Sequence, residues 1–150
     1  MTEVRFYHLK NMPLDRALPG ILTQAHKRGM RVVVKCADEN HVKGIDDLLW
    51  QFEAESFLPH GFKGAPQDQP IWISTSDENV NDASVLVVTD GSVSEALDGY
   101  DLCCEIFDGM DQSAVEKARA RWKNLKDTDC TLKYYQRILI GKVENSVLCH

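Results

Sequence analysis

The sequence lacks the short motifs that identify the common catalytic and nucleotide-binding sites. It contains no G-x-x-x-x-G-K-[ST] phosphate loop, and no G-x-G-x-x-G follows its first predicted strand. Neither the G-x-S-x-G of serine hydrolases nor the H-E-x-x-H of zinc proteases occurs. From its motifs we therefore assign the chain no catalytic residue, no cofactor and no nucleotide-binding loop.

Cysteine pairs, long apolar runs and an excess of positive charge are also missing. The five cysteines are odd in number and show no C-x-x-C spacing, which favours reduced thiols in a cytoplasm over disulfides or a metal site. No apolar run approaches the roughly 20 residues that span a bilayer, and the N-terminus lacks the basic and apolar regions of a signal peptide. The net charge of −6 counts against tight binding of nucleic-acid phosphates. We expect a cytoplasmic protein that does not bind membranes and that meets DNA only through another protein.

The chain does have the composition and element order of one α/β domain. Its 150 residues, 43% apolar and 27% charged, suit a single globular domain over residues 1–150. Strand-like and helix-like patterns alternate with short connections, which predicts an α/β three-layer sandwich with a mostly parallel sheet. The strands are expected at residues 4–9, 31–36, 71–74, 85–88 and 102–107.

Three helices are expected between these strands. The first opens at Pro13 and stops at Gly29, with apolar residues at three-to-four spacing. Asp38 is the expected cap of the second helix, and Ser113 of a third helix that runs to about Lys126.

The remaining segments have weaker patterns. Residues 53–70 are predicted to be loop, because they contain three prolines and two glycines. Residues 131–140 fit an edge strand or a docked tail. A further alternative is that the chain forms a loose tail from about residue 137.

A first unusual block, DDLLWQFEAESFLPHGF over residues 46–62, places large apolar rings around a rigid X-Pro turn. Trp50 sits a step off the expected inner face of its helix, and Phe57 lies in the loop that follows. These rings fit either ordinary core packing or the apolar wall of a ligand groove. His60 is interpreted as a loop anchor, because no nucleophile accompanies it.

A second block, VEKARARWKNLK, begins at Val115 and is a dense run of cations in an acidic protein. At 100° per residue, Val115, Arg119, Trp122 and Lys126 fall within about 60° of one another, and Lys123 extends that edge. The run fits an ordinary amphipathic helix with a half-buried tryptophan and solvated cations. The alternative is a cationic ledge beside exposed aromatic surface, which would attract an acidic ligand.

With these blocks the chain resembles the chi subunit of bacterial DNA polymerase III, a component associated with the clamp loader. The matching strings run in order over about residues 4–136: FYHL, GMRVVVKCADE, IDDLLWQFEAESFLPHG, QPIWIS, VLVVTDG and ARARWK. The D-x-L-W…SF-x-PH string followed by a late ARxRWK is specific as a combination, whereas each short string alone is not.

The resemblance implies a Rossmann-like α/β fold without a nucleotide site and without enzymatic activity. Chi subunits bind the acidic C-terminal tail of the single-stranded-DNA-binding protein (SSB). They also bind the psi subunit, which links chi to the clamp loader, and in some bacteria a helicase. By resemblance, the residues expected to hold the SSB tail are Trp50 and Phe57 as an apolar wall and Val115, Arg119, Trp122, Lys123 and Lys126 on the basic helix.

One departure from the family pattern lies on this helix. Val115 stands where the better-known pattern has a lysine, which removes one cation. Lys126 or Lys117 would compensate for it. The segment after residue 131 departs as well, and the sequence does not locate the surface that would bind psi.

We therefore predict a non-enzymatic adaptor that connects the polymerase to SSB-coated strands. Two other classes remain open at this point. A direct binder of single-stranded nucleic acid would use the same aromatic and basic residues, against the net charge of −6. A small flavodoxin-like enzyme would need a phosphate-binding nest after the first strand, where residues 10–13 contain no glycine.

Overall fold

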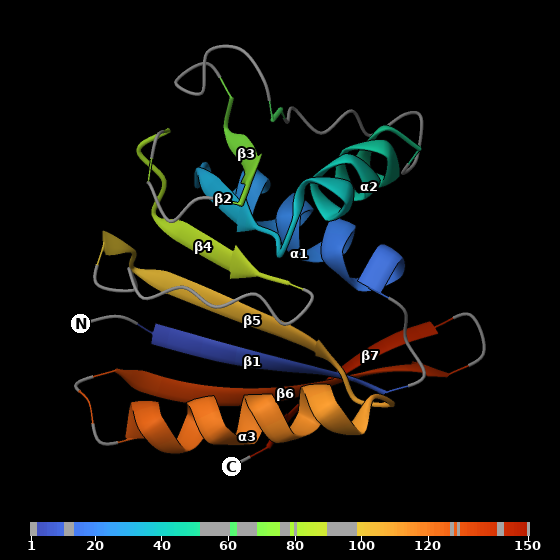
Figure 1. Ribbon diagram of the computed structural model, residues 1–150, viewed down its shortest axis with the longest axis vertical. Helices are drawn as coiled ribbons and strands as arrows, with labels where there is room; N and C mark the ends of the chain where they lie inside the picture. Colours follow the sequence, from blue (N-terminus) through green and yellow to red (C-terminus); the bar gives the residue numbers. More distant parts are fainter. Residues whose placement is uncertain are drawn as a thin grey trace.

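A single, mostly parallel β-sheet organises the chain. The computed structural model describes residues 3–10, 14–51, 61–62, 69–75, 79, 81–89, 99–126, 128, 130–140 and 143–149. Side chains are described in these ranges except at residues 14–16, 50–51, 136–140 and 143–149. Within them the 7-stranded sheet has the order β3-β2-β4-β5-β1-β6-β7 (Figure 1).

The pairing confirms the predicted mostly parallel sheet. Neighbouring strands from β3 to β6 are all parallel, and β7 runs antiparallel to β6. The five predicted strands are all present, with bounds that differ from the prediction by no more than one residue at either end. The strands are β1 (Glu3–Lys10), β2 (Val32–Lys35), β3 (Ile71–Ser74), β4 (Val85–Val88), β5 (Leu102–Asp108), β6 (Thr131–Ile140) and β7 (Val143–Cys149).

Helices cover both faces of this sheet, which confirms the three-layer α/β sandwich. α1 (Leu14–Lys27) and α2 (Glu39–Gln51) lie over one face, and α3 (Gln112–Lys126) lies over the other. Val33 of β2 joins the cluster that contains Ala118 of α3, whereas its two valine neighbours join the cluster beneath α1 and α2. β2 is therefore buried along its whole length, as expected for a parallel strand covered on both faces. No helix in the described ranges is long and apolar enough to cross a membrane.

The start of α2 and the end of α1 are both set by residues that the sequence analysis identified. The amide of His41 donates to Asp38 Oδ1 at 2.9 Å, so Asp38 caps α2 as predicted. The turn after α1 closes at Gly29, whose φ of 73° is a conformation that glycine adopts without strain. The amides of Gly29 and Met30 donate back to carbonyls of the last helical turn.

The predicted cap of the third helix is wrong by two residues. The carboxylate of Asp111 accepts a hydrogen bond from the amide of Ser113 (3.0 Å), and its carbonyl accepts one from Val115 (3.0 Å). α3 begins at Gln112, so Ser113 lies inside the first turn. An ionised aspartate is favoured over a serine at this position because it also interacts with the positive end of the helix dipole.

The C-terminal segment completes the sheet. Residues 131–140 form β6, which is an interior strand between β1 and β7 and not the edge strand expected as one alternative. A loose tail from about residue 137 is a further expectation. There, β6 continues to Ile140 and pairs with β7. The hairpin escapes sequence reasoning because VENSVLC alternates only weakly between polar and apolar residues.

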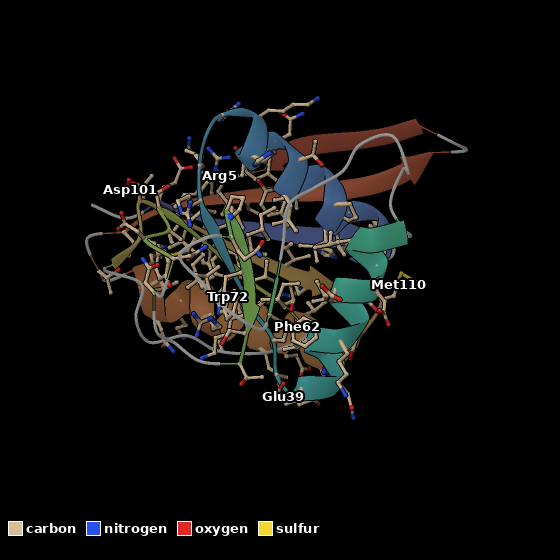
Figure 2. The ribbon with its side chains drawn as sticks, turned by 90° about the horizontal axis from the view of Figure 1, so that it is seen from above. Arg5, Glu39, Phe62, Trp72, Asp101 and Met110 are labelled. Carbon is tan, nitrogen blue, oxygen red and sulfur yellow. The ribbon has the colours of Figure 1, made fainter. Side chains whose placement is uncertain are left out.

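Most of the predicted loop over residues 53–70 lies outside the described residues. Its described part includes Gly61, which runs beside β3: its amide donates to the carbonyl of Ile71 (3.0 Å), and Ile73 donates back to it (2.9 Å). Phe62 packs against the cluster beneath α1 and α2, and Figure 2 shows it beside α2.

A buried ion pair joins α3 to the sheet. Glu105 of β5 is 6% exposed, and its Oε1 accepts a hydrogen bond from Nε of Arg121 at 2.5 Å. Nη2 of the same guanidinium forms an ion pair with this oxygen at 2.5 Å. Burial raises the pKa of Glu105, and the guanidinium of Arg121 acts in the opposite direction. The arginine therefore keeps a buried carboxylate from being left without a counter-charge.

Arg121→Ala is expected to destabilise the fold by about 3 kcal/mol at neutral pH, because it leaves the Glu105 carboxylate buried and unpaired. A carboxyl group whose pKa is raised in the folded state favours folding at low pH and loses that contribution as the pH rises through the folded pKa. The cost of Arg121→Ala should therefore shrink as the pH falls from about 7 to about 5. Urea unfolding of the wild type and of Arg121→Ala at both pH values measures this change in the free energy of unfolding.

Arg119→Ala removes an exposed arginine from the same helix and is the matched control for stability. It should stay within about 0.5 kcal/mol of the wild type. Equal effects of the two substitutions would contradict the role assigned to Arg121.

Candidate functional site

The predicted site residues on the basic helix divide between two sides of α3. Val115 and Ala118 are 9% and 8% exposed, so both pack against the sheet. Trp122 is half-buried on the same side: its ring meets Phe6 of β1 edge-on at 5.3 Å between centroids, and Tyr134 of β6 at 6.4 Å. Val115 thus belongs to the packing face of α3, while Trp122 lies at its margin and keeps part of its ring accessible.

Three cations occupy the neighbouring, exposed side of α3. Arg119, Lys123 and Lys126 are exposed and lie within about 60° of one another around the helix. None of them forms an ion pair with another residue in the described ranges. We call these three residues the cationic strip. Arg121, about 200° around the helix from Arg119, is instead held by Glu105.

The carboxyl ends of β1 and β5 form a topological switch point near this strip. The two strands are paired neighbours, yet the helices that follow them cover opposite faces of the sheet. Open α/β sheets commonly bind ligands at such a point, outside the carboxyl ends of the strands. In Figure 2, Asp101 and Met110 mark the two ends of β5. Met110, directly after the switch point, is a large apolar side chain that is 69% exposed.

His8 of β1 lies at the switch point on the α3 side of the sheet. Its Nδ1 is hydrogen-bonded to the hydroxyl of Tyr134. Its ring packs against Phe107 of β5 at 5.0 Å between centroids and against Tyr134 at 5.8 Å. Three strands therefore fix the orientation of this imidazole.

The cationic strip and His8 are close enough to interact electrostatically. Burial lowers the pKa of His8, and the positive charges of Lys10 and Arg119 lower it further, while Asp108 raises it. Arg119 is the first of the three cations along α3, which begins after the carboxyl end of β5, so it is the member of the strip nearest to the switch point.

A glycine makes the close packing at the switch point possible. The amide of Gly109 donates to the carbonyl of Leu9 at 2.7 Å. A Cβ at Gly109 would lie 2.0 Å from Nε2 of His8 and 2.6 Å from the carbonyl oxygen of Leu9. Glycine is therefore required here for space, since any side chain would displace both the imidazole and the strand.

Of Trp50 and Phe57, the aromatic residues predicted to join these cations, the structure describes only the backbone of Trp50. Trp50 is in the last turn of α2, which covers the face of the sheet opposite α3, and the two helices lie towards opposite ends of the long axis in Figure 1. The side chain of Trp50 and the whole of Phe57 lie outside the described residues. The structure brings Arg119 and Trp122 together on α3, and the apolar wall of Trp50 and Phe57 stays a prediction.

The cysteines and acids give no second site within the described ranges. Cys103 and Cys104 are both buried and point to opposite faces of the sheet. Burial raises the pKa of Cys103 to about 12, so its nucleophilic thiolate is strongly disfavoured. No group of three or more His, Cys, Asp or Glu side chains in the described part of the chain could hold a metal ion.

No strong sequence signal marks His8 and Gly109 as site residues. The available clue is that His8 follows Phe6 by two positions in a strand and so shares its face. Its neighbours Phe107 and Tyr134 come from strands whose order in the sheet the sequence does not give.

Gly109→Ala is expected to destabilise the protein by about 1–3 kcal/mol and to displace the ring of His8, because the added methyl group overlaps both His8 and Leu9. Thermal unfolding measures the first effect, and the NMR shifts of the imidazole measure the second. Gly99→Ala is the matched control, since an added Cβ there meets nothing within 4 Å. A Gly109→Ala protein with wild-type stability and wild-type imidazole shifts would contradict the required close approach.

The chain matches one family of known proteins. The model of the family described as DNA polymerase III chi subunit, HolC, matches residues 1–133. A probable DNA polymerase III subunit chi from Rickettsia prowazekii is 30% identical over 90 residues, which cover 59% of this chain and 54% of that protein. The DNA polymerase III subunit chi of Pseudomonas aeruginosa is 28% identical over 90 residues, covering 58% and 63%. The matched part of the chain thus spans between about half and two thirds of the length of these relatives.

A solved structure shares the fold. The C-terminal domain of S. cerevisiae Dbp5, solved bound to Gle1 and IP6, aligns with a TM-score of 0.53 over 89% of this chain and 90% of that one, at 14% identity. At that identity the likeness concerns the fold alone. The sequence matches show the family as well as the fold. Because the family model matches residues 1–133 and the named relatives are chi subunits, the chain belongs to the DNA polymerase III chi subunit family.

Proposed function

We propose that this chain is a non-enzymatic adaptor of the DNA polymerase III holoenzyme that binds the acidic C-terminal tail of SSB. The observation that carries the proposal is the cationic strip: three exposed cations without an acidic partner in the described ranges, beside a half-buried tryptophan. The strip lies in a chain whose net charge is −6. A local positive surface on an acidic protein favours a short anionic peptide over a long polyanion, which the rest of the molecule repels.

Each member of the strip has a distinct role in this proposal. Arg119 clamps the terminal carboxylate, because its planar guanidinium offers two parallel N–H donors and a lysine does not. Lys123 and Lys126 meet acidic residues upstream in the tail. The accessible part of Trp122 contacts the apolar side chain at the end of the tail.

The apolar wall expected from Trp50 and Phe57 stays a prediction. Since α2 lies across the sheet from α3, we do not expect Trp50 to share a pocket with Arg119. An adaptor needs two surfaces that can be occupied at once. The end of α2 is therefore the surface that would bind a second partner. This partner is psi, which links chi to the clamp loader, or a helicase.

A modest affinity for a single tail suits this role. A short tail buries little surface, so its dissociation constant should be on the order of micromolar. Several tails on one SSB oligomer would raise the effective affinity for a coated strand without any new contact.

Arg119→Ala is expected to weaken binding of a peptide with the C-terminal sequence of the cognate SSB by about 2–3 kcal/mol, because the carboxylate loses both donors of a charged hydrogen bond. Arg119→Lys should recover only part of the loss. Anisotropy of a labelled peptide measures both. Amidating the terminal carboxylate should make the wild type and Arg119→Ala bind alike, which assigns the contact to that group.

Two further variants act as controls for this measurement. Lys117 is exposed on α3 about 160° from Arg119, and Lys117→Ala should change the affinity by less than about 0.5 kcal/mol. Trp50→Ala should also have little effect on the tail. If Trp50→Ala abolishes tail binding while Arg119→Ala does not, the tail is held at α2 and the cationic strip is surface charge.

The rival function, direct binding of single-stranded nucleic acid, would use the same cationic strip and Trp122 for phosphates and stacking. We expect negligible binding of a bare oligonucleotide at about 0.15 M salt, where the Debye length is about 8 Å and only local charges attract. Binding should appear when the oligonucleotide is coated with the cognate SSB and vanish when that SSB lacks its acidic tip. An electrophoretic mobility assay with these three substrates distinguishes the two functions, and tight binding to the bare strand would overturn the adaptor.

A further inference from the structure

The imidazole of His8 is held with one ring nitrogen engaged and the other available. Nδ1 is hydrogen-bonded to the hydroxyl of Tyr134, and the rings of Phe107 and Tyr134 pack against the imidazole. Gly109 approaches the ring at Nε2 with no room for a side chain. No hydrogen-bond partner of Nε2 is found among the described residues. A ligand that reaches Nε2 from the side away from Gly109 would therefore break no existing hydrogen bond.

Each element packed against His8 contributes a group that faces it. Lys10 lies on the same strand, Arg119 on α3 and Asp108 on β5, while β6 supplies the neutral hydroxyl of Tyr134. Burial lowers the pKa of His8, the two cations lower it further, and Asp108 acts the other way. In the free protein the imidazole is therefore neutral near pH 7, beside two permanent positive charges.

An anion bound between Arg119 and His8 reverses this balance. It offsets the cations that disfavour a charged imidazole, and it offers an acceptor to Nε2–H. The hydroxyl of Tyr134 can accept from a protonated Nδ1 as well as donate to an unprotonated one, so protonation costs no hydrogen bond there. His8 is therefore more readily protonated in the complex than in the free protein.

We propose that His8 is a second carboxylate-binding group beside Arg119, and that the acidic tail binds with uptake of a proton by this imidazole. The proton comes from the buffer; Nε2–H then donates to a carboxylate oxygen of the tail and Nδ1–H to Tyr134. The inference rests on the proposed tail binding and adds to it a residue and a dependence on pH.

The sign of the effect follows from linkage. Because the pKa of His8 is higher in the complex than in the free protein, binding tightens as the pH falls through the interval between those two values. The carboxylates of the peptide stay ionised above about pH 5, so they do not produce this change. We expect binding that is about fivefold or more tighter at pH 5.5 than at pH 8, because the complex takes up a proton over this interval.

Isothermal titration calorimetry of the full chain with the SSB tail peptide tests the proposal. Titrations from pH 5.5 to pH 8, in buffers with different heats of ionisation, give both the affinity and the number of protons taken up. His8→Gln keeps a polar partner for Tyr134 but cannot take up a proton, so it should bind with the high-pH affinity of the wild type at every pH. If His8→Gln does not fold, His8→Phe makes the same test.

His41→Gln is the matched control. His41 pairs with Asp38 at 3.0 Å on α2, across the sheet from the cationic strip, so its loss should leave the pH dependence of the wild type intact. Equal wild-type affinity at pH 5.5 and pH 8, or an unchanged pH dependence in the His8 variant, would overturn the inference while the tail still binds. No tail binding at any pH would remove the proposed function and the inference together.

Discussion

The need to cover both faces of a parallel sheet is the constraint on which the rest of this structure depends. α1 and α2 cover one face, so the other face of β1, β5 and β6 needs α3. Trp122 meets that need by packing edge-on against Phe6 and Tyr134, and Arg121 adds its bond to Glu105. These contacts fix the rotation of α3 about its axis, which decides which of its residues reach solvent.

Stability and recognition are therefore assigned to different residues of one short string. Residues two positions apart on a helix point about 200° apart, so the two arginines of ARARWK cannot serve the same purpose. Arg121 completes the sheet contact, and Arg119 is left exposed next to the carboxyl end of β1. The packing of α3 thereby positions a cation at the switch point of the sheet without any further structural element.

The sequence was sufficient for several features that depend on local interactions, although it placed the cap of α3 at Ser113 instead of Asp111. Three-to-four spacing predicted the inner face of α2, and the Asp38 cap needed only its own turn. Prediction failed where the partner comes from a distant segment: the spacing that grouped Val115 with the exposed cations could not show that it packs on the sheet. For the same reason, the contact of His8 with Tyr134 could not be read from spacing. The family resemblance supplied the fold, but the distribution of residues over the two faces required the structure.

The position of β1 in the sheet also constrains how the chain can reach this fold. Glu3 pairs with Leu102 on one side and with Thr131 on the other, so β1 lies between two strands that are synthesised long after it. β2, β3 and β4 form their own parallel ladder from one continuous segment and can assemble earlier. Pairings of such long range close large loops and form slowly. During synthesis the apolar β1 strand has no native partner until most of the chain has emerged, and this is the interval in which the protein is most open to misassembly.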